Sequence, residues 1–113
     1  MKFYFDCGLP RSGSTLLTAI LNQNPQIHAG TLSPVFEVMY YTDEILQGEQ
    51  AQAFPKPEVF RKMVRDGIIT YYCNRDEPII IDKCRAWPAH IDMLKKYVTD
   101  DPRIICTVRN PLD

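Results

Sequence analysis

The stretch GLPRSGSTLL, residues 8–17, decides the fold because it sets a glycine-rich turn between an apolar strand and an apolar helix. Before it, KFYFDC (2–7) predicts a short buried strand that is rich in aromatic residues. After it, STLLTAILNQ (14–23) predicts a helix with its leucines and isoleucine on one face, ended by Asn24-Pro25. A strand, a tight turn and a helix N-terminus together form an anion site, because the first N–H groups of a helix lack intrahelical partners.

The turn has nearly the spacing of a nucleotide-triphosphate loop, with four residues between Gly8 and Gly13. Ser14 stands where such a loop carries its lysine. Arg11, inside the turn, has a planar guanidinium with five donors and can take over the role of the missing lysine. The alternative is a tight strand–helix turn without a ligand.

Two further apolar runs predict strands. PIIIDK (78–83) is fully apolar in its middle, as expected of a parallel strand that is covered on both faces, and RIICTV (103–108) predicts a third apolar strand. Helices are predicted from Pro34, after Pro57 and from Pro88. This order predicts right-handed crossovers and an α/β fold, a P-loop NTPase-like parallel sheet of three strands flanked by helices.

Two segments are less clear. QIHA (26–29) is short and ambiguous, and the polar segment 48–57, with its two prolines, predicts either an ordinary connector or a lid over a substrate. We expect a single domain, 1–113, that is incomplete at the C-terminus and is the N-terminal part of a longer protein, because a helix would barely begin at Pro111. The uncovered edge of the last strand makes a homo-oligomer plausible.

Composition excludes several partners. The chain of 113 residues has a net charge of −1, which argues against a broad surface for nucleic acid. No apolar segment is long enough to span a membrane, and the first strand begins too early for a signal peptide. The four cysteines lack metal-ligand spacing, so we expect free thiols in a reducing compartment, the cytoplasm.

The segment Gly8–Leu16 resembles the 5′-phosphosulfate-binding loop of PAPS-dependent sulfotransferases, where PAPS is 3′-phosphoadenosine 5′-phosphosulfate. It is most similar to the G-x-P-R-S-G-[ST]-T-L subgroup, which includes tyrosylprotein sulfotransferases and many bacterial homologues. The likeness returns at 80–83 and in RIICTVRNP (103–111), which is similar to the 3′-phosphate strand of the family.

The resemblance implies an enzyme that transfers a sulfuryl group from PAPS to a hydroxyl or amine and releases PAP, without a metal. The acceptor would be a small molecule, a carbohydrate or a peptide. The resemblance also implies the donor-binding residues, which are Pro10, Arg11, Ser12, Gly13, Ser14 and Thr15 for the phosphosulfate and Arg109 for the 3′-phosphate.

Three residues are candidates for catalysis. Arg11 would bind the leaving phosphate. Lys83 follows an apolar run and so lies at the carboxyl end of a strand, where ligands sit in open parallel sheets, and the family has a lysine there that contacts the transferring group. The base is uncertain, because Thr31 and Leu32 replace the glutamate of tyrosylprotein sulfotransferases. Glu37 is the nearest carboxylate downstream, and a solvated helix carboxylate is the alternative.

Several other residues allow either a functional or a structural interpretation. His28 titrates near neutral pH and could act as a base, or it is structural. Trp87 and the pair Tyr40-Tyr41 could stack on an adenine or line an acceptor pocket, or they belong to the core. His90, at the start of a helix, is expected to be structural.

Asp82 supports a rival function. It ends an apolar strand like the Mg²⁺-associated aspartate of P-loop NTPases, which would suit a small-molecule kinase that uses ATP and Mg²⁺. The serine in place of the loop lysine argues against a kinase. Asp82 is predicted to pair with Lys83, Arg85 or Arg11, or to orient the site. A catalytically incomplete nucleotide-binding remnant is a third alternative.

Overall fold

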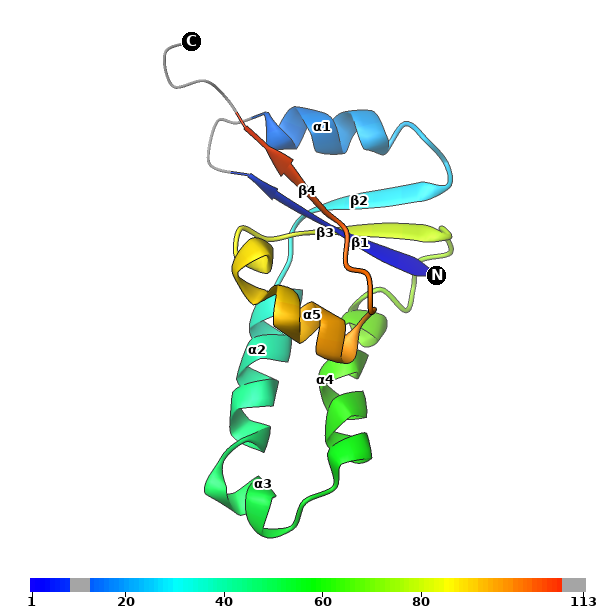
Figure 1. Ribbon diagram of the computed structural model, residues 1–113. Helices are drawn as coiled ribbons and strands as arrows, with labels where there is room; N and C mark the ends of the chain where they lie inside the picture. The colour runs from blue at the N-terminus through cyan, green and yellow to red at the C-terminus, as the bar shows by residue number, and fades with distance from the viewer. Residues whose placement is uncertain (9–12, 109–113) are drawn as a thin grey trace.

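The structure, a computed structural model, describes residues 1–8 and 13–108 (Figure 1). These residues form an α/β fold with one parallel sheet in the strand order β2-β3-β1-β4. In chain order the elements are β1 (Lys2–Gly8), α1 (Ser14–Leu21), β2 (Ile27–Leu32), α2 (Val35–Leu46), α3 (Glu49–Ala53), α4 (Pro57–Tyr71), β3 (Ile79–Lys83), η1 (Trp87–His90), α5 (Ile91–Tyr97) and β4 (Ile104–Thr107).

The strand β1 lies inside the sheet and fixes its register. It pairs in parallel with β3, where Asp6 lies opposite Lys83, and with β4, where Cys7 lies opposite Cys106. On the far side of β3, β2 is also parallel, with an irregularity between Ala29 and Leu32. All the strands of this sheet therefore end at the same edge, as the predicted α/β fold requires.

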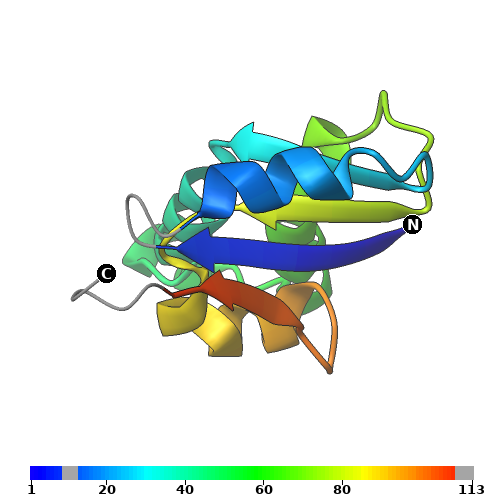
Figure 2. The same cartoon turned by 90° about the horizontal axis from the view of Figure 1, so that it is seen from above.

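The two faces of the sheet are covered unequally. The helix α1 lies on one face, and α2, α4 and α5 lie on the other (Figures 1 and 2). The core fills the second face, with contributions from β1, β3, α2, α4, η1 and α5: Phe5, Val35, Met39, Val64, Ile68, Tyr72, Ile80, Trp87 and Leu94. On the first face, Leu16 is 66% exposed and Ile20 54% exposed, so the apolar stripe of α1 is only partly used.

Asp82 is the polar centre of the covered face. Its carboxylate is fully buried and accepts hydrogen bonds from the Ser33 hydroxyl at 2.5 Å, the Tyr72 hydroxyl at 2.6 Å and the Trp87 indole N–H at 3.0 Å. Burial raises the pKa of Asp82, and these three bonds act in the opposite direction. The prediction that Asp82 pairs with Lys83 or Arg85 was wrong, since these donors take its carboxylate; the third predicted partner, Arg11, lies outside the described residues.

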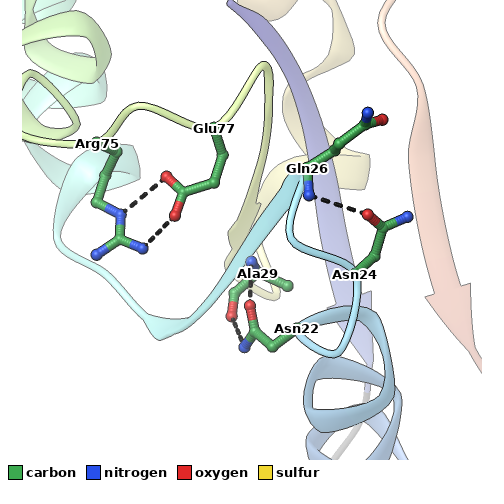
Figure 3. A network of polar contacts seen from close by, with 6 residues as sticks. All are labelled: Asn22, Asn24, Gln26, Ala29, Arg75 and Glu77. Atoms are coloured by element: carbon green, nitrogen blue, oxygen red, sulfur yellow. Dashed lines mark hydrogen bonds and ion pairs between the residues drawn. The ribbon is translucent and has the colours of Figure 1, made fainter.

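The turn between α1 and β2 is fixed by asparagine side chains (Figure 3). The Asn22 side chain accepts a hydrogen bond from the Ala29 N–H at 2.8 Å and donates one to the Ala29 carbonyl at 2.6 Å. Asn24 accepts a bond from the Gln26 N–H at 2.9 Å, which closes the turn. Because β2 pairs with β3 on its other side, Asn22 satisfies backbone groups on the open edge of the sheet.

The sheet has one strand more than predicted. QIHA, ambiguous in the sequence, belongs to β2, which extends to Leu32 and makes the sheet four-stranded. Only Ala29 of this strand is buried, because β2 is an edge strand. The apolar run that marks a central parallel strand is therefore absent from its sequence.

Two helical predictions also differ from the structure. The segment 48–57 contains the short helix α3, and the helix predicted from Pro88 begins with a 3₁₀ turn, η1, before α5. On α4, Val64 and Ile68 are buried, whereas Met63 and Tyr71 are about half exposed. The neighbouring Tyr72 points inward instead, and its hydroxyl donates a hydrogen bond to the Asp82 carboxylate.

We predict that Asp82→Ala lowers the free energy of unfolding by about 3 kcal/mol or more, because it leaves three buried donors without their acceptor. Urea unfolding followed by tryptophan fluorescence measures the change, since Trp87 is one of the donors. Asp76→Ala, which removes an exposed carboxylate, is the control and should change stability by less than about 0.5 kcal/mol. Equal stability of the two variants would contradict the central role of Asp82.

Candidate functional site

The candidate site lies at the edge where the parallel strands end. The last residues of β1, β3 and β4 are Gly8, Lys83 and Thr107, and the N-terminus of α1 begins at Ser14 beside them. Ligands of open α/β sheets bind at this edge, outside the carboxyl ends of the strands. Gly8 and Gly13, which flank the glycine-rich segment, thus lie at the same edge of the sheet as Lys83, about seventy residues away in the sequence.

Gly13 shapes the start of α1. Its φ of 92° lies in the left-handed region that side chains other than glycine rarely adopt, and its carbonyl accepts the Leu17 N–H at 3.0 Å. Apart from its chain neighbours, no atom of the described residues lies within 4 Å of the place that a Cβ would take at Gly13, so glycine is needed there for its conformation and not for space. The N–H groups of the first turn remain available to an anion, and Thr15 is exposed among them.

Several predicted donor-binding residues fall outside this description. Pro10, Arg11, Ser12 and Arg109 belong to the stretches 9–12 and 109–113, which lie outside the described residues. The described ends of these stretches, Gly8 and Gly13 on one side and Val108 on the other, flank the same edge of the sheet. The described chain therefore reaches both predicted phosphate-binding segments at that edge.

Lys83 ends β3 half-buried and lies opposite Asp6 of β1. Side chains alternate between the faces of a sheet, so Lys83 and Asp6 share the face of α1, whereas Asp82 and Phe5 face the core. A lysine on this face stands between the end of the sheet and the N-terminus of α1. Its contact with a transferring anionic group stays a prediction.

Asp6 is a buried carboxylate beneath the turn, with 1% of its surface exposed. Burial raises its pKa, while the charge of Lys83 and a hydrogen bond from Thr18 of α1 act in the opposite direction. Within the described residues 1–8 and 13–108, its Oδ1 atom has no hydrogen-bond partner. An unpaired buried carboxylate oxygen is costly, so its presence at the candidate site calls for a functional reason.

The two candidate bases are placed differently. Glu37 lies in the first turn of α2, just after the end of β2, and its side chain is exposed. His28 lies inside β2, half-buried, with its ring edge-on to Tyr72 at 5.8 Å between ring centres. Burial and the charge of Arg75 lower the pKa of His28, and the charge of Glu77 opposes them. His28 is thus held neutral within the sheet, as a structural histidine would be.

Arg75 and Glu77, which set the charge near His28, form an ion pair in the loop before β3 (Figure 3). The guanidinium binds the carboxylate with two hydrogen bonds, one of them at 3.2 Å from Nε. The pairing lowers the pKa of Glu77.

The aromatic candidates belong to the core and its margin. Trp87 is fully buried and packs on Phe5, with 4.8 Å between ring centres, so it offers no face to an adenine. The Tyr40 ring stacks on the Phe36 ring, with 5.6 Å between ring centres, and lies edge-on to the His90 ring, with 5.2 Å between ring centres. His90 is structural, as predicted. Tyr41, at 59% exposed, is the more accessible of the tyrosine pair.

The four cysteines are free thiols. Cys7 is buried, and its pKa is raised to about 12 by burial and by the neighbouring Cys106. In the part of the chain that the structure describes, no group of three or more His, Cys, Asp or Glu side chains could hold a metal ion. Nor does any helix among residues 1–8 and 13–108 combine the length and the apolar character needed to cross a membrane.

Sequence reasoning missed Asp6, Ser33 and Tyr72. Asp6 gave one signal, which is a carboxylate inside an otherwise aromatic strand, directly before the glycine-rich turn. Ser33 and Tyr72 gave none, because only the fold brings the loop before α2 and the residue after α4 to Asp82.

A family model described as "Sulfotransferase family" matches residues 5–113. The match spans the glycine-rich turn, Lys83 and the end of β4. No curated protein sequence matches the chain significantly.

We predict that His28 makes the protein less stable in weak acid. Its pKa in the folded state is below the ordinary value of 6.5, so the unfolded chain takes up a proton first, and stability falls as pH drops through this range. His28→Gln should reduce the stability lost between about pH 7 and pH 5, measured by thermal unfolding. An NMR titration should give His28 a pKa below 6.5; a value above it would contradict the prediction.

Proposed function

The chain belongs to the sulfotransferase family, and from this premise we propose that it transfers a sulfuryl group from PAPS to a hydroxyl or amine acceptor and releases PAP. The acceptor is a small molecule, a carbohydrate or a peptide. One observation carries the proposal. The left-handed Gly13 opens the N-terminus of α1 at the same edge of the sheet where Lys83 ends β3. This arrangement supplies N–H donors and a cation to one anion.

The residues of the turn suit the 5′-phosphosulfate. The N–H groups at the start of α1 and the hydroxyls of Ser14 and Thr15 donate hydrogen bonds, and Arg11 adds a guanidinium that can bridge two anionic groups. Across the edge, Arg109 follows β4 and binds the 3′-phosphate. PAPS supplies the activated sulfuryl group when it is bound.

Lys83 and Arg11 stabilise the charge that develops during transfer. The acceptor oxygen or nitrogen forms a bond to sulfur while the bond from sulfur to the bridging phosphate oxygen breaks. The electron pair of that bond stays on the phosphate, and the acceptor proton passes to a base. Cations held near the leaving oxygen lower the barrier, because they are already oriented before the charge appears.

We assign the proton-accepting role to Glu37. Its carboxylate is exposed in the first turn of α2, near the edge where β2 ends. An exposed carboxylate can accept a proton and pass it to water, whereas His28 lies inside β2 against Tyr72. The assignment leaves the loop after β2 as the acceptor side of the site.

The kinase alternative loses its main support. It requires Asp82 to face the phosphate loop and reach Mg²⁺. Both oxygens of Asp82 instead accept hydrogen bonds on the opposite face of the sheet, from Ser33, Tyr72 and Trp87.

We predict that the chain binds PAP in calorimetric titration, and that Arg11→Ala and Arg109→Ala each weaken binding by about tenfold or more, because each removes a cation from one phosphate. Arg65→Ala is the matched control, since Arg65 is exposed and lines a cavity at the opposite, amino edge of the sheet. It should bind PAP as the wild-type chain does.

The same titration with ATP and Mg²⁺ distinguishes the sulfotransferase proposal from the kinase alternative. Tighter binding of ATP with Mg²⁺ than of PAP, unaffected by Arg109→Ala, would contradict the sulfotransferase proposal and favour a kinase. Absence of PAP binding to the wild-type chain would also count against it.

A further inference from the structure

The carboxylate of Asp6 combines features that a purely structural residue would not need. It is almost completely buried on the face of the sheet that α1 covers, and Thr18 of α1 hydrogen-bonds to it. Within the described residues its Oδ1 atom has no hydrogen-bond partner. The other buried carboxylate, Asp82, is fully engaged by its three donors. The two buried carboxylates therefore differ, since Oδ1 of Asp6 has no hydrogen-bond partner among the described residues.

The surroundings of Asp6 point to one partner for that oxygen. From β3, Lys83 lies directly opposite and acts on Asp6 through its charge. The helix α1 (Ser14–Leu21) carries no ionisable side chain, and the neighbour of Asp6 on β4 is Ile105. Cys7 and Cys106 face the other side of the sheet. Lys83 is therefore the one charged side chain of the described residues that faces Asp6 from these packed elements.

We propose that Asp6 is a positioning residue that holds the Lys83 ammonium at the end of the sheet, where the sulfuryl group is transferred. This inference rests on the proposed function. The Asp6 carboxylate is fixed by β1 and Thr18, so it gives the flexible lysine stem a fixed anchor below the turn. The ammonium then faces the leaving phosphate without first having to be ordered.

The proposal explains why a costly carboxylate is kept. Burial raises the pKa of Asp6, so ionising it opposes folding: the stability is present at low pH and is lost as pH rises through the ordinary carboxyl range toward the raised pKa. Replacing Asp6 by the neutral, equally large Asn should therefore raise the temperature of unfolding near pH 7. If Asp6→Asn is more stable than the wild-type chain but less active, the Asp6 carboxylate is kept for the reaction and not for folding.

The test uses the whole chain and turnover of PAPS to PAP with water as the acceptor. Asp6→Asn should lower turnover about tenfold or more while the Kd for PAP stays within about twofold of the wild-type value. Wild-type turnover should fall as pH drops through the raised pKa of Asp6, and the contribution of Asp6 to this acid limb should be absent from Asp6→Asn. Asp101→Asn, which removes an exposed carboxylate paired with Arg103, is the control and should leave turnover and its pH profile unchanged.

A double-mutant cycle with Lys83→Met shows whether Asp6 acts through Lys83. In the Lys83→Met background, Asp6→Asn should cause no further loss of turnover. In unfolding experiments, Lys83→Met should destabilise the wild-type chain more than the Asp6→Asn chain, because it strips a buried carboxylate of its counter-charge. If Asp6→Asn folds poorly, Asp6→Ser gives the same comparison.

The outcomes separate this inference from the proposed function. Additive effects of the two substitutions, or loss of turnover in proportion to lost stability, would overturn the role of Asp6 in a chain that binds PAP. A wild-type chain that binds no PAP would overturn the proposed function and, with it, the positioning role. The coupling in unfolding would still report whether Asp6 and Lys83 interact.

Discussion

The parallel pairing of β1 with both β3 and β4 is the constraint on which the rest of the structure depends. Because these strands run in the same direction, their carboxyl ends meet at one edge, and each crossover must return over a face of the sheet. The turn after β1 leads directly into α1, so the N-terminus of a helix faces that edge. Lys83 reaches the same edge only because β3 is in register with β1.

The two buried aspartates show how the faces of the sheet divide their tasks. Asp82, on the covered face, has three donors and ties β3 to the loop before α2, to the end of α4 and to η1. Asp6, on the α1 face, holds one oxygen without a partner among the described residues. A satisfied buried carboxylate fixes a unique packing, whereas an unsatisfied one stores a cost that a nearby cation can relieve. The hydrogen bonds of Asp82 thus stabilise the covered face, whereas Asp6 and Lys83 on the α1 face belong to the candidate site.

The sequence was sufficient for the elements whose patterns are local. The apolar runs of β1, β3 and β4 predicted strands, and the glycine-rich turn predicted the start of α1. The sequence was not sufficient for β2, because this edge strand has one buried residue and no apolar run, and its neighbour in the sheet is distant in the chain. The partners of Asp82 were mispredicted for a related reason. Adjacent charges in the sequence suggested ion pairs, but alternation along β3 sends Lys83 and Asp82 to opposite faces.

The layer over the α1 face is the thinner of the two. Leu16 and Ile20 remain largely exposed, so hydrophobic burial contributes less to the attachment of α1 than to that of α2 and α4. Polar bonds also attach α1, from Thr18 in its middle to Asp6 and from Asn22 at its C-terminal end to Ala29 of β2. These bonds keep the helix against the sheet although its apolar stripe is little buried. An anion that contacts the turn and Lys83 together would add the attachment that packing does not supply, since ligands stabilise the state to which they bind.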